Sequence, residues 1–147
     1  HADHHTTIDH AAADARSSGL YKGILDGNSR GVFTGRIIVR EGSSGTAALQ
    51  TNRNLLLSDT AVVDTRPQLE IYNDDVRCNH GATVGRLDQD ALFYLQARGI
   101  PRDRARGLLT YAFASEVLER LGDLPVRREI EGAVSSLVGA PSTAELQ

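Results

Sequence analysis

Short runs of aliphatic and β-branched residues alternate with polar turn-forming clusters between Tyr21 and His80. Two runs, at 37–39 and 55–57, are continuously apolar, which is typical of strands covered on both faces. Asn, Asp, Gly and Ser between the runs favour tight turns. The pattern predicts strands at 21–25, 32–40, 47–50, 55–57, 61–64, 68–72 and 76–80, with turns at 26–28, 42–45, 52–54, 58–59 and 73–75.

Many short strands joined by close turns predict a mainly β body, which can be a sandwich, a barrel or a β-helix. Several runs are too short to bury much surface in a sandwich. The polar clusters at 52–54 and 74–75 resemble corners between stacked rungs, so we favour the β-helix. Because a stacked solenoid needs neighbouring rungs, we expect a missing N-terminal portion or a partner to cover the open strand edges.

The apolar spacing becomes helical after residue 86. Asp88 is a good N-cap, Asp90 places a carboxylate in the first turn, and the pair Arg98-Gly99 supplies a basic last turn and a glycine stop. Pro101 suits the first turn of a second helix. The pattern predicts a β-helix core portion at 1–86, a helical C-terminal domain at 87–139 and a disordered tail at 140–147.

Two apolar stripes mark the predicted second and third helices. The second helix carries an apolar residue at every fourth position, namely Leu109, Phe113, Val117 and Leu121. The third, at about 125–138, carries Ile130, Val134, Leu137 and Val138. Short helices bury little surface alone, so we expect them to pack on the β body or to present a face to a partner.

Composition narrows the class of protein. The 147 residues include no Met and no Trp, so we interpret the chain as a fragment of a longer protein. The net charge is −3 and the basic residues are scattered, which argues against nucleic-acid binding. A single cysteine excludes an internal disulfide and fits a reducing compartment. No apolar run approaches the roughly 20 residues of a membrane helix, so we expect a cytoplasmic protein with no membrane association.

The candidate chemistry lies at Cys78 and His80. Residues two apart on a strand share a face, so the thiol and the imidazole project together. Both are ligands for zinc or for iron in clusters. Two ligands do not close a metal site, so either a second chain completes it or the pair is structural.

Three other chemistries are weaker. Cys78 could act as a nucleophile with His80 as its base, but the sequence offers no orienting third group. The N-terminal histidines His1, His4, His5 and His10 invite a metal interpretation, although neutral histidines more often form hydrogen bonds within a strand. The carboxylates Asp64, Glu70, Asp74 and Asp75 are explained equally well by turns and solvation. The chain has no GxGxxG and no P-loop, so nucleotide chemistry is not expected.

Several long motifs resemble one known family. They are YKGIL at 21–25, GVFTG at 31–35, QTNRNLLLS at 50–58, RPQLEIY at 66–72, DDVRCNHGATVG at 74–85 and LFYLQARGI at 92–100. Together they are similar to the C-terminal core of the SufB/SufD family of iron–sulfur cluster assembly proteins. The form Cys78-x-His80-Gly-Ala is more similar to the SufD branch than to the SufB branch.

The resemblance implies a right-handed parallel β-helix followed by a small helical domain. It implies a scaffold subunit, not an enzyme, that pairs with SufB through the β-helix and docks the SufC ATPase through the helices. The ATP site would belong to SufC. A transient iron–sulfur cluster or iron would form near the SufB interface, where the family's histidine falls on His80 and its neighbouring cysteine on Cys78.

For SufC docking we expect Arg98, Ile100 and the Leu109/Phe113 face of the second helix. Exposed rungs also favour self-association of the isolated chain as a homodimer. A thiol enzyme using Cys78 and His80, and a purely structural β-solenoid interaction module, are the alternative functions.

Overall fold

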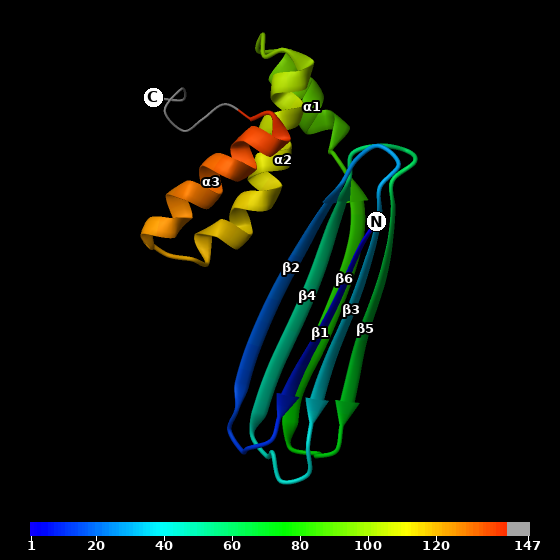
Figure 1. Cartoon of the computed structure of the whole chain (residues 1–147), viewed down its shortest axis with the longest axis vertical. Helices are drawn as coiled ribbons and strands as arrows, with labels where there is room; N and C mark the ends of the chain where they lie inside the picture. Colours follow the sequence, from blue (N-terminus) through cyan, green and yellow to red (C-terminus); the bar gives the residue numbers. More distant parts are fainter. Residues whose placement is uncertain (141–147) are drawn as a thin grey trace. The chain divides into compact units, whose positions relative to one another are not determined.

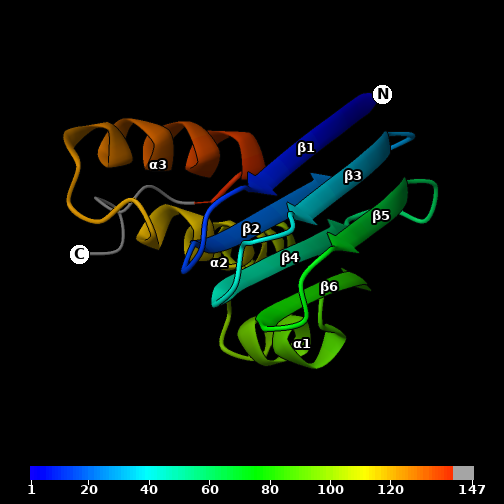
Figure 2. The ribbon, with the colours of Figure 1, turned by 90° about the horizontal axis from the view of Figure 1, so that it is seen from below.

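Residues 1–140, which the computed structural model describes, form six strands followed by three helices (Figure 1). One parallel sheet has the order β1-β3-β5 and the other the order β2-β4-β6, so the chain crosses to the other sheet at every connection (Figure 2). The strands are β1 (Ala2–His10), β2 (Arg16–Leu25), β3 (Arg30–Val39), β4 (Thr46–Leu56), β5 (Val62–Ile71) and β6 (Val76–Arg86). By its contacts the chain divides into two compact units, His1–Gly85 and a second that begins at Arg86.

The register of the strands places similar side chains opposite one another on neighbouring strands. Ile8 lies opposite Ile37, which in turn lies opposite Leu69, so one apolar row crosses the first sheet. Ile37 and Val39 are completely buried and form the centre of the core with Ala48 of β4. Such ladders make each strand depend on its neighbours, because one strand cannot bury its apolar face alone.

Part of the space between the sheets is polar. Gln50, Asn52 and Asn54 of β4 are 1%, 2% and 5% exposed, and Asn54 Nδ2 donates to Asn52 Oδ1 at 2.7 Å. The Gln50 amide lies against Gly35 of β3, where a Cβ atom would come within 2.2 Å of Nε2. Neither amide atom of Gln50 has a hydrogen-bond partner among the described residues. Gly35 therefore provides the space in which this buried amide fits.

The outer face of the sheet β1-β3-β5 is charged and internally paired. Arg36 donates twice to Glu70, at 2.7 and 2.6 Å, and Arg40 donates to both oxygens of Asp9. The hydrogen bond from Arg36 lowers the pKa of Glu70, and that from Arg40 lowers the pKa of Asp9. These pairs link neighbouring strands on a face that is open to water.

The strands are longer than the apolar runs predicted. The polar cluster at 52–54, expected as a turn, lies inside β4 and joins the runs at 47–50 and 55–57 into one strand. The runs at 61–64 and 68–72 are likewise one strand, β5. The prediction was wrong because buried Asn side chains interrupt the apolar pattern without ending the strand. The turns expected at 26–28, 42–45, 58–59 and 73–75 are confirmed as connections between strands.

The mainly β prediction with a helical C-terminal part is confirmed at this level. The closed, right-handed course of a β-helix stays a prediction. The N-terminal segment that carries His4, His5 and His10 is the strand β1.

The second unit contains α1 (Gln89–Gln96), α2 (Arg102–Glu119) and α3 (Pro125–Val138). Asp88 caps α1, since its Oδ1 accepts from the backbone N–H groups of Asp90 and Ala91 at 2.9 and 3.2 Å. Gly139 ends α3 in the left-handed conformation, with φ of 65°. The backbone of α2 lies close to the end of α3: a Cβ atom added to Gly107 would lie 2.4 Å from the Gly139 carbonyl oxygen.

Two details of the helix prediction were wrong. Helix α1 ends at Gln96, so Arg98 lies beyond its last turn, and Pro101 is the N-cap of α2 instead of a residue in its first turn. The fully buried residues of α2 are Ala105, Gly107, Thr110 and Leu118, whereas Leu109 and Phe113 of the predicted stripe are only partly buried. At Gly107 the lack of a side chain allows the close approach to Gly139. The predicted tail from 141 onward lies outside the described residues.

None of the helices among residues 1–140 is long and apolar enough to cross a bilayer.

Candidate functional site at the edge strand

Strand β6 is the last strand of its sheet and is hydrogen-bonded to β4 on one side only, within the described part of the chain (Figure 2). The connection that precedes it is tied to the turn before β4, because Gly45 N donates to the Asp75 carbonyl oxygen at 2.8 Å. Further along, Asn54 Nδ2 donates to the Thr83 carbonyl oxygen at 3.4 Å. These contacts hold β6 beside β4, and its other edge retains free backbone hydrogen-bonding groups.

Cys78 faces the space between the sheets. Together with Val76, it packs against the core of Ile37, Val39 and Ala48. The thiol is free and the residue is half-buried. Its neighbours in this cluster are aliphatic, so packing alone would explain a small, weakly polar residue at this position.

His80 lies two residues further on and is exposed. Strand alternation puts it on the same face as Val76 and Cys78, as the sequence predicted. Every residue from 79 to 86 is exposed, and a Cβ at Gly81 or Gly85 would meet nothing within 4 Å. The imidazole therefore projects from a strand segment whose two faces are both uncovered within the unit.

Chemically the pair can supply at most two ligands to a metal ion. A thiolate and an imidazole are two of the four ligands that zinc or an iron of a cluster takes. Among residues 1–140, no group of three or more His, Cys, Asp or Glu side chains could hold a metal ion. Any further ligands would have to come from outside residues 1–140. His80 is better placed than Cys78 to join such ligands, because it is exposed.

The other candidate residues have ordinary roles. His10 is buried and its Nε2 lies 2.9 Å from Ser17 Oγ, while His5 Nε2 lies 3.0 Å from the Asp3 carboxylate. Three of the four carboxylates considered for a hard ion are also engaged elsewhere. Asp64 pairs with Arg30, Glu70 pairs with Arg36, and Asp75 accepts from Ser44 Oγ. His5 and His10 therefore form local contacts, as expected for a strand.

The predicted docking residues of the helical unit are partly accessible. The Arg98 guanidinium stacks 3.4 Å from the centre of the Tyr94 ring, which is a cation–π contact. Ile100, Leu109 and Phe113 are half-buried.

The sequence reasoning missed a more exposed apolar set in the same unit. Phe93 is 72% exposed, Leu137 is 86% exposed and Leu124 is 54% exposed. Phe93 is adjacent to Leu92, which is buried, so a helical plot of α1 alone would have placed Phe93 off the buried face.

The fold defines a class of protein: two sheets of parallel strands followed by three helices, with a cysteine and a histidine two residues apart on the last strand. Residues 1–113 match the family model described as SUF system FeS cluster assembly, SufBD core domain. The chain belongs to the SufBD family.

Among its relatives, the iron–sulfur cluster assembly protein SufD of Escherichia coli K12 is 44% identical over 128 residues, which cover 87% of this chain and 30% of that protein. An iron–sulfur cluster assembly SufBD family protein of Synechocystis is 41% identical over 120 residues, covering 82% of this chain and 26% of that protein. SufD of Bacillus subtilis is 33% identical over 133 residues, covering 90% and 30% respectively. The chain therefore spans less than a third of the length of these relatives.

Proposed function

We propose that this chain is the C-terminal part of a SufD-like scaffold subunit that supports iron–sulfur cluster assembly in the SUF system. The names of its relatives, SufD and SufBD family proteins of iron–sulfur cluster assembly, support this role. The subunit holds components in position and carries no catalytic residues of its own. The cluster, or the iron for it, is cargo that forms at a subunit interface.

One observation carries the proposal: His80 is exposed on an edge strand beside the half-buried Cys78. A partner strand that pairs with the free edge of β6 would bring its own ligands next to the imidazole. A SufB subunit is the partner we propose. The ligand set would then be shared, with His80 as the principal ligand from this chain and Cys78 as the second.

The alternating strands also support the finer fold proposal. Two parallel sheets formed by successive strands are what consecutive rungs of a right-handed parallel β-helix would give. In the full-length protein, earlier rungs would continue the stack beyond β1 and β2. The last rung, β5 with β6, would meet SufB. Val62, Ile71, Tyr72 and Val84 of this rung and its connection are 42% to 59% exposed, which suits an interface.

We propose the helical unit as the docking site for the SufC ATPase. Arg98, Ile100, Leu109 and Phe113 were the residues expected from the resemblance. The exposed Phe93 and Leu137 extend the apolar surface available in that unit. ATP chemistry would belong entirely to SufC.

The test uses the full-length protein coexpressed with SufB and SufC and purified without oxygen. His80→Ala should leave SufB and SufC copurification intact and lower the iron and sulfide per complex several-fold. Cys78→Ala should lower them less. His5→Ala is the matched control, because His5 is also exposed on a strand, and its complex should keep wild-type iron and sulfide.

Wild-type iron and sulfide in the His80→Ala complex would refute the ligand role. Loss of SufB from that complex would instead make His80 a structural interface residue. The alternative of a thiol enzyme predicts rapid alkylation of Cys78 in the isolated protein. Slow alkylation, as expected for a thiol packed on Ile37 and Val39, would exclude it.

A further inference from the structure

The sheet β2-β4-β6 has an unbalanced charge. None of its three strands contains an Asp or a Glu, whereas they contain Arg16, Lys22, Arg53, Arg77 and Arg86. The other sheet contains carboxylates that pair with its arginines, for example Glu70 with Arg36. Since residues 1–147 carry a net charge of −3, the cationic character of the sheet β2-β4-β6 is local.

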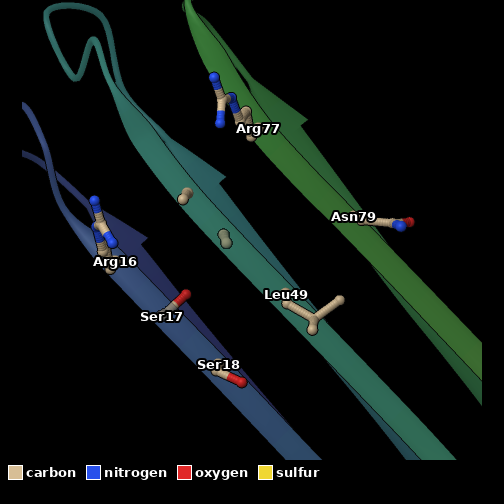
Figure 3. A pocket seen from close by; sticks show the side chains of 8 residues that line it. Arg16, Ser17, Ser18, Leu49, Arg77 and Asn79 are labelled. Carbon is tan, nitrogen blue, oxygen red and sulfur yellow. The ribbon is translucent and has the colours of Figure 1, made fainter.

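Two of these arginines flank a shallow groove on this sheet. Figure 3 shows Arg16 on β2 and Arg77 on β6, one on each side of β4. Both are exposed, and neither forms an ion pair with another residue of the described chain. The nearest acid before Arg77, Asp75, accepts a hydrogen bond from Ser44 instead. The two guanidinium groups are therefore available to an external anion.

The floor of the groove is small and partly apolar. Ala47 of β4 is the register partner of Arg16, so no large side chain stands between the two arginines. Leu49, which is 44% exposed, lies next along β4 between Ser18 and Asn79 (Figure 3). Neighbouring strands lie about 4.8 Å apart, so the backbones that carry Arg16 and Arg77 are about 10 Å apart.

We propose that this groove docks an acidic protein segment in an extended conformation. Two of its carboxylates would pair with Arg16 and Arg77, since a guanidinium binds a carboxylate through two parallel hydrogen bonds. An apolar side chain of the segment would cover Leu49. A nucleic acid fits less well, because the groove has no aromatic side chain for base stacking and the chain is negative overall.

This surface is independent of the proposed cluster site. Arg77 and Asn79 alternate with Cys78 and His80 along β6, so they lie on opposite faces of the sheet. Variants of the groove can therefore be tested without changing either proposed ligand.

The probe is a fluorescein-labelled peptide of alternating Glu and Leu, with a Gln-and-Leu peptide as its neutral counterpart. Binding to the full-length protein is measured by fluorescence anisotropy. Arg16→Gln/Arg77→Gln should weaken binding of the acidic peptide about tenfold or more, and higher salt should weaken the wild-type complex, because exposed charges are screened. Arg66→Gln/Arg128→Gln removes the same charge from two exposed arginines elsewhere and should change affinity less than about twofold.

A second variant tests the groove in case the double arginine variant does not fold. Ala47→Glu would place a carboxylate between the two arginines and should abolish binding while the melting temperature is retained. The proposal would be overturned if Arg66→Gln/Arg128→Gln lost as much affinity for the acidic peptide as Arg16→Gln/Arg77→Gln. It would also be overturned if the Gln-and-Leu peptide bound the wild type as tightly as the acidic peptide. Displacement by millimolar inorganic phosphate would overturn it as well, as would an oligonucleotide that binds through the same two arginines as tightly as the acidic peptide.

Discussion

Two glycines inside helices should respond in opposite ways to the same substitution. Gly107 in α2 and Gly132 in α3 both lie well inside their helices. Replacing a helical glycine by alanine stabilises the helix by about 1 kcal/mol, because alanine loses less backbone entropy on folding. A Cβ on Gly132 would meet nothing within 4 Å, so Gly132→Ala should deliver that gain.

At Gly107 the same gain is opposed by a clash. The new Cβ would lie 2.4 Å from the Gly139 carbonyl oxygen and 2.7 Å from its carbon, and backbone atoms cannot rotate away as a side chain would. Overpacking of this kind costs about 1 to 3 kcal/mol. Because both variants share the propensity gain, the difference between their unfolding free energies isolates the clash, and we expect it to be about 1 to 3 kcal/mol.

The assay is urea unfolding of the wild type and the two variants, followed by circular dichroism at 222 nm. Gly132→Ala should raise the midpoint, and Gly107→Ala should leave it unchanged or lower it. If Gly107→Ala stabilises the protein as much as Gly132→Ala, the close approach of α2 to the end of α3 is wrong.

Two further predictions concern the strand unit. Gly35→Ala should destabilise it by about 1 to 3 kcal/mol, because the new Cβ would meet the buried Gln50 amide. Gln50→Ala in the same chain should recover most of that loss, and additive effects of the two substitutions in the double-mutant cycle would contradict the contact. The pKa of Glu70 is held below its ordinary value of 4.5 by Arg36, so this ion pair stabilises the fold above that pH and the stabilisation is lost as the pH falls through the lowered value. Arg36→Gln should therefore flatten the decline in urea midpoint below about pH 4.5, and an unchanged decline would show that the pair contributes nothing.

The β elements could be located from the sequence, but their lengths could not. Apolar runs and turn residues placed four of the five predicted turns correctly, since turn chemistry is local, but the turn predicted at 52–54 lies inside β4. The extent of β4 was missed because Gln50, Asn52 and Asn54 are buried polar residues. A prediction from the local pattern assigns polar residues of this kind to the surface or to a turn. Only the opposite sheet, with the space left by Gly35, makes their burial feasible.

The start of α1 and the end of α3 were predictable because the turn chemistry there is local. Asp88 and Gly139 act through hydrogen bonds and backbone conformations within their own turns. Which residues of α2 are fully buried was not predictable, because the burial of Gly107 depends on the backbone of Gly139, which is far away in the sequence.

By itself the sequence determined the order of strands before helices, most of the turns, the Asp88 cap and the same-face pairing of Cys78 with His80. These depend on residues near one another in the chain. The tertiary structure decided which member of the pair is accessible. Cys78 is half-buried because strands from both sheets meet beside it, whereas His80 is exposed because the last strand has no neighbour beyond it in the described chain. Burial depends on contacts between segments far apart in sequence, and no local pattern contains that information.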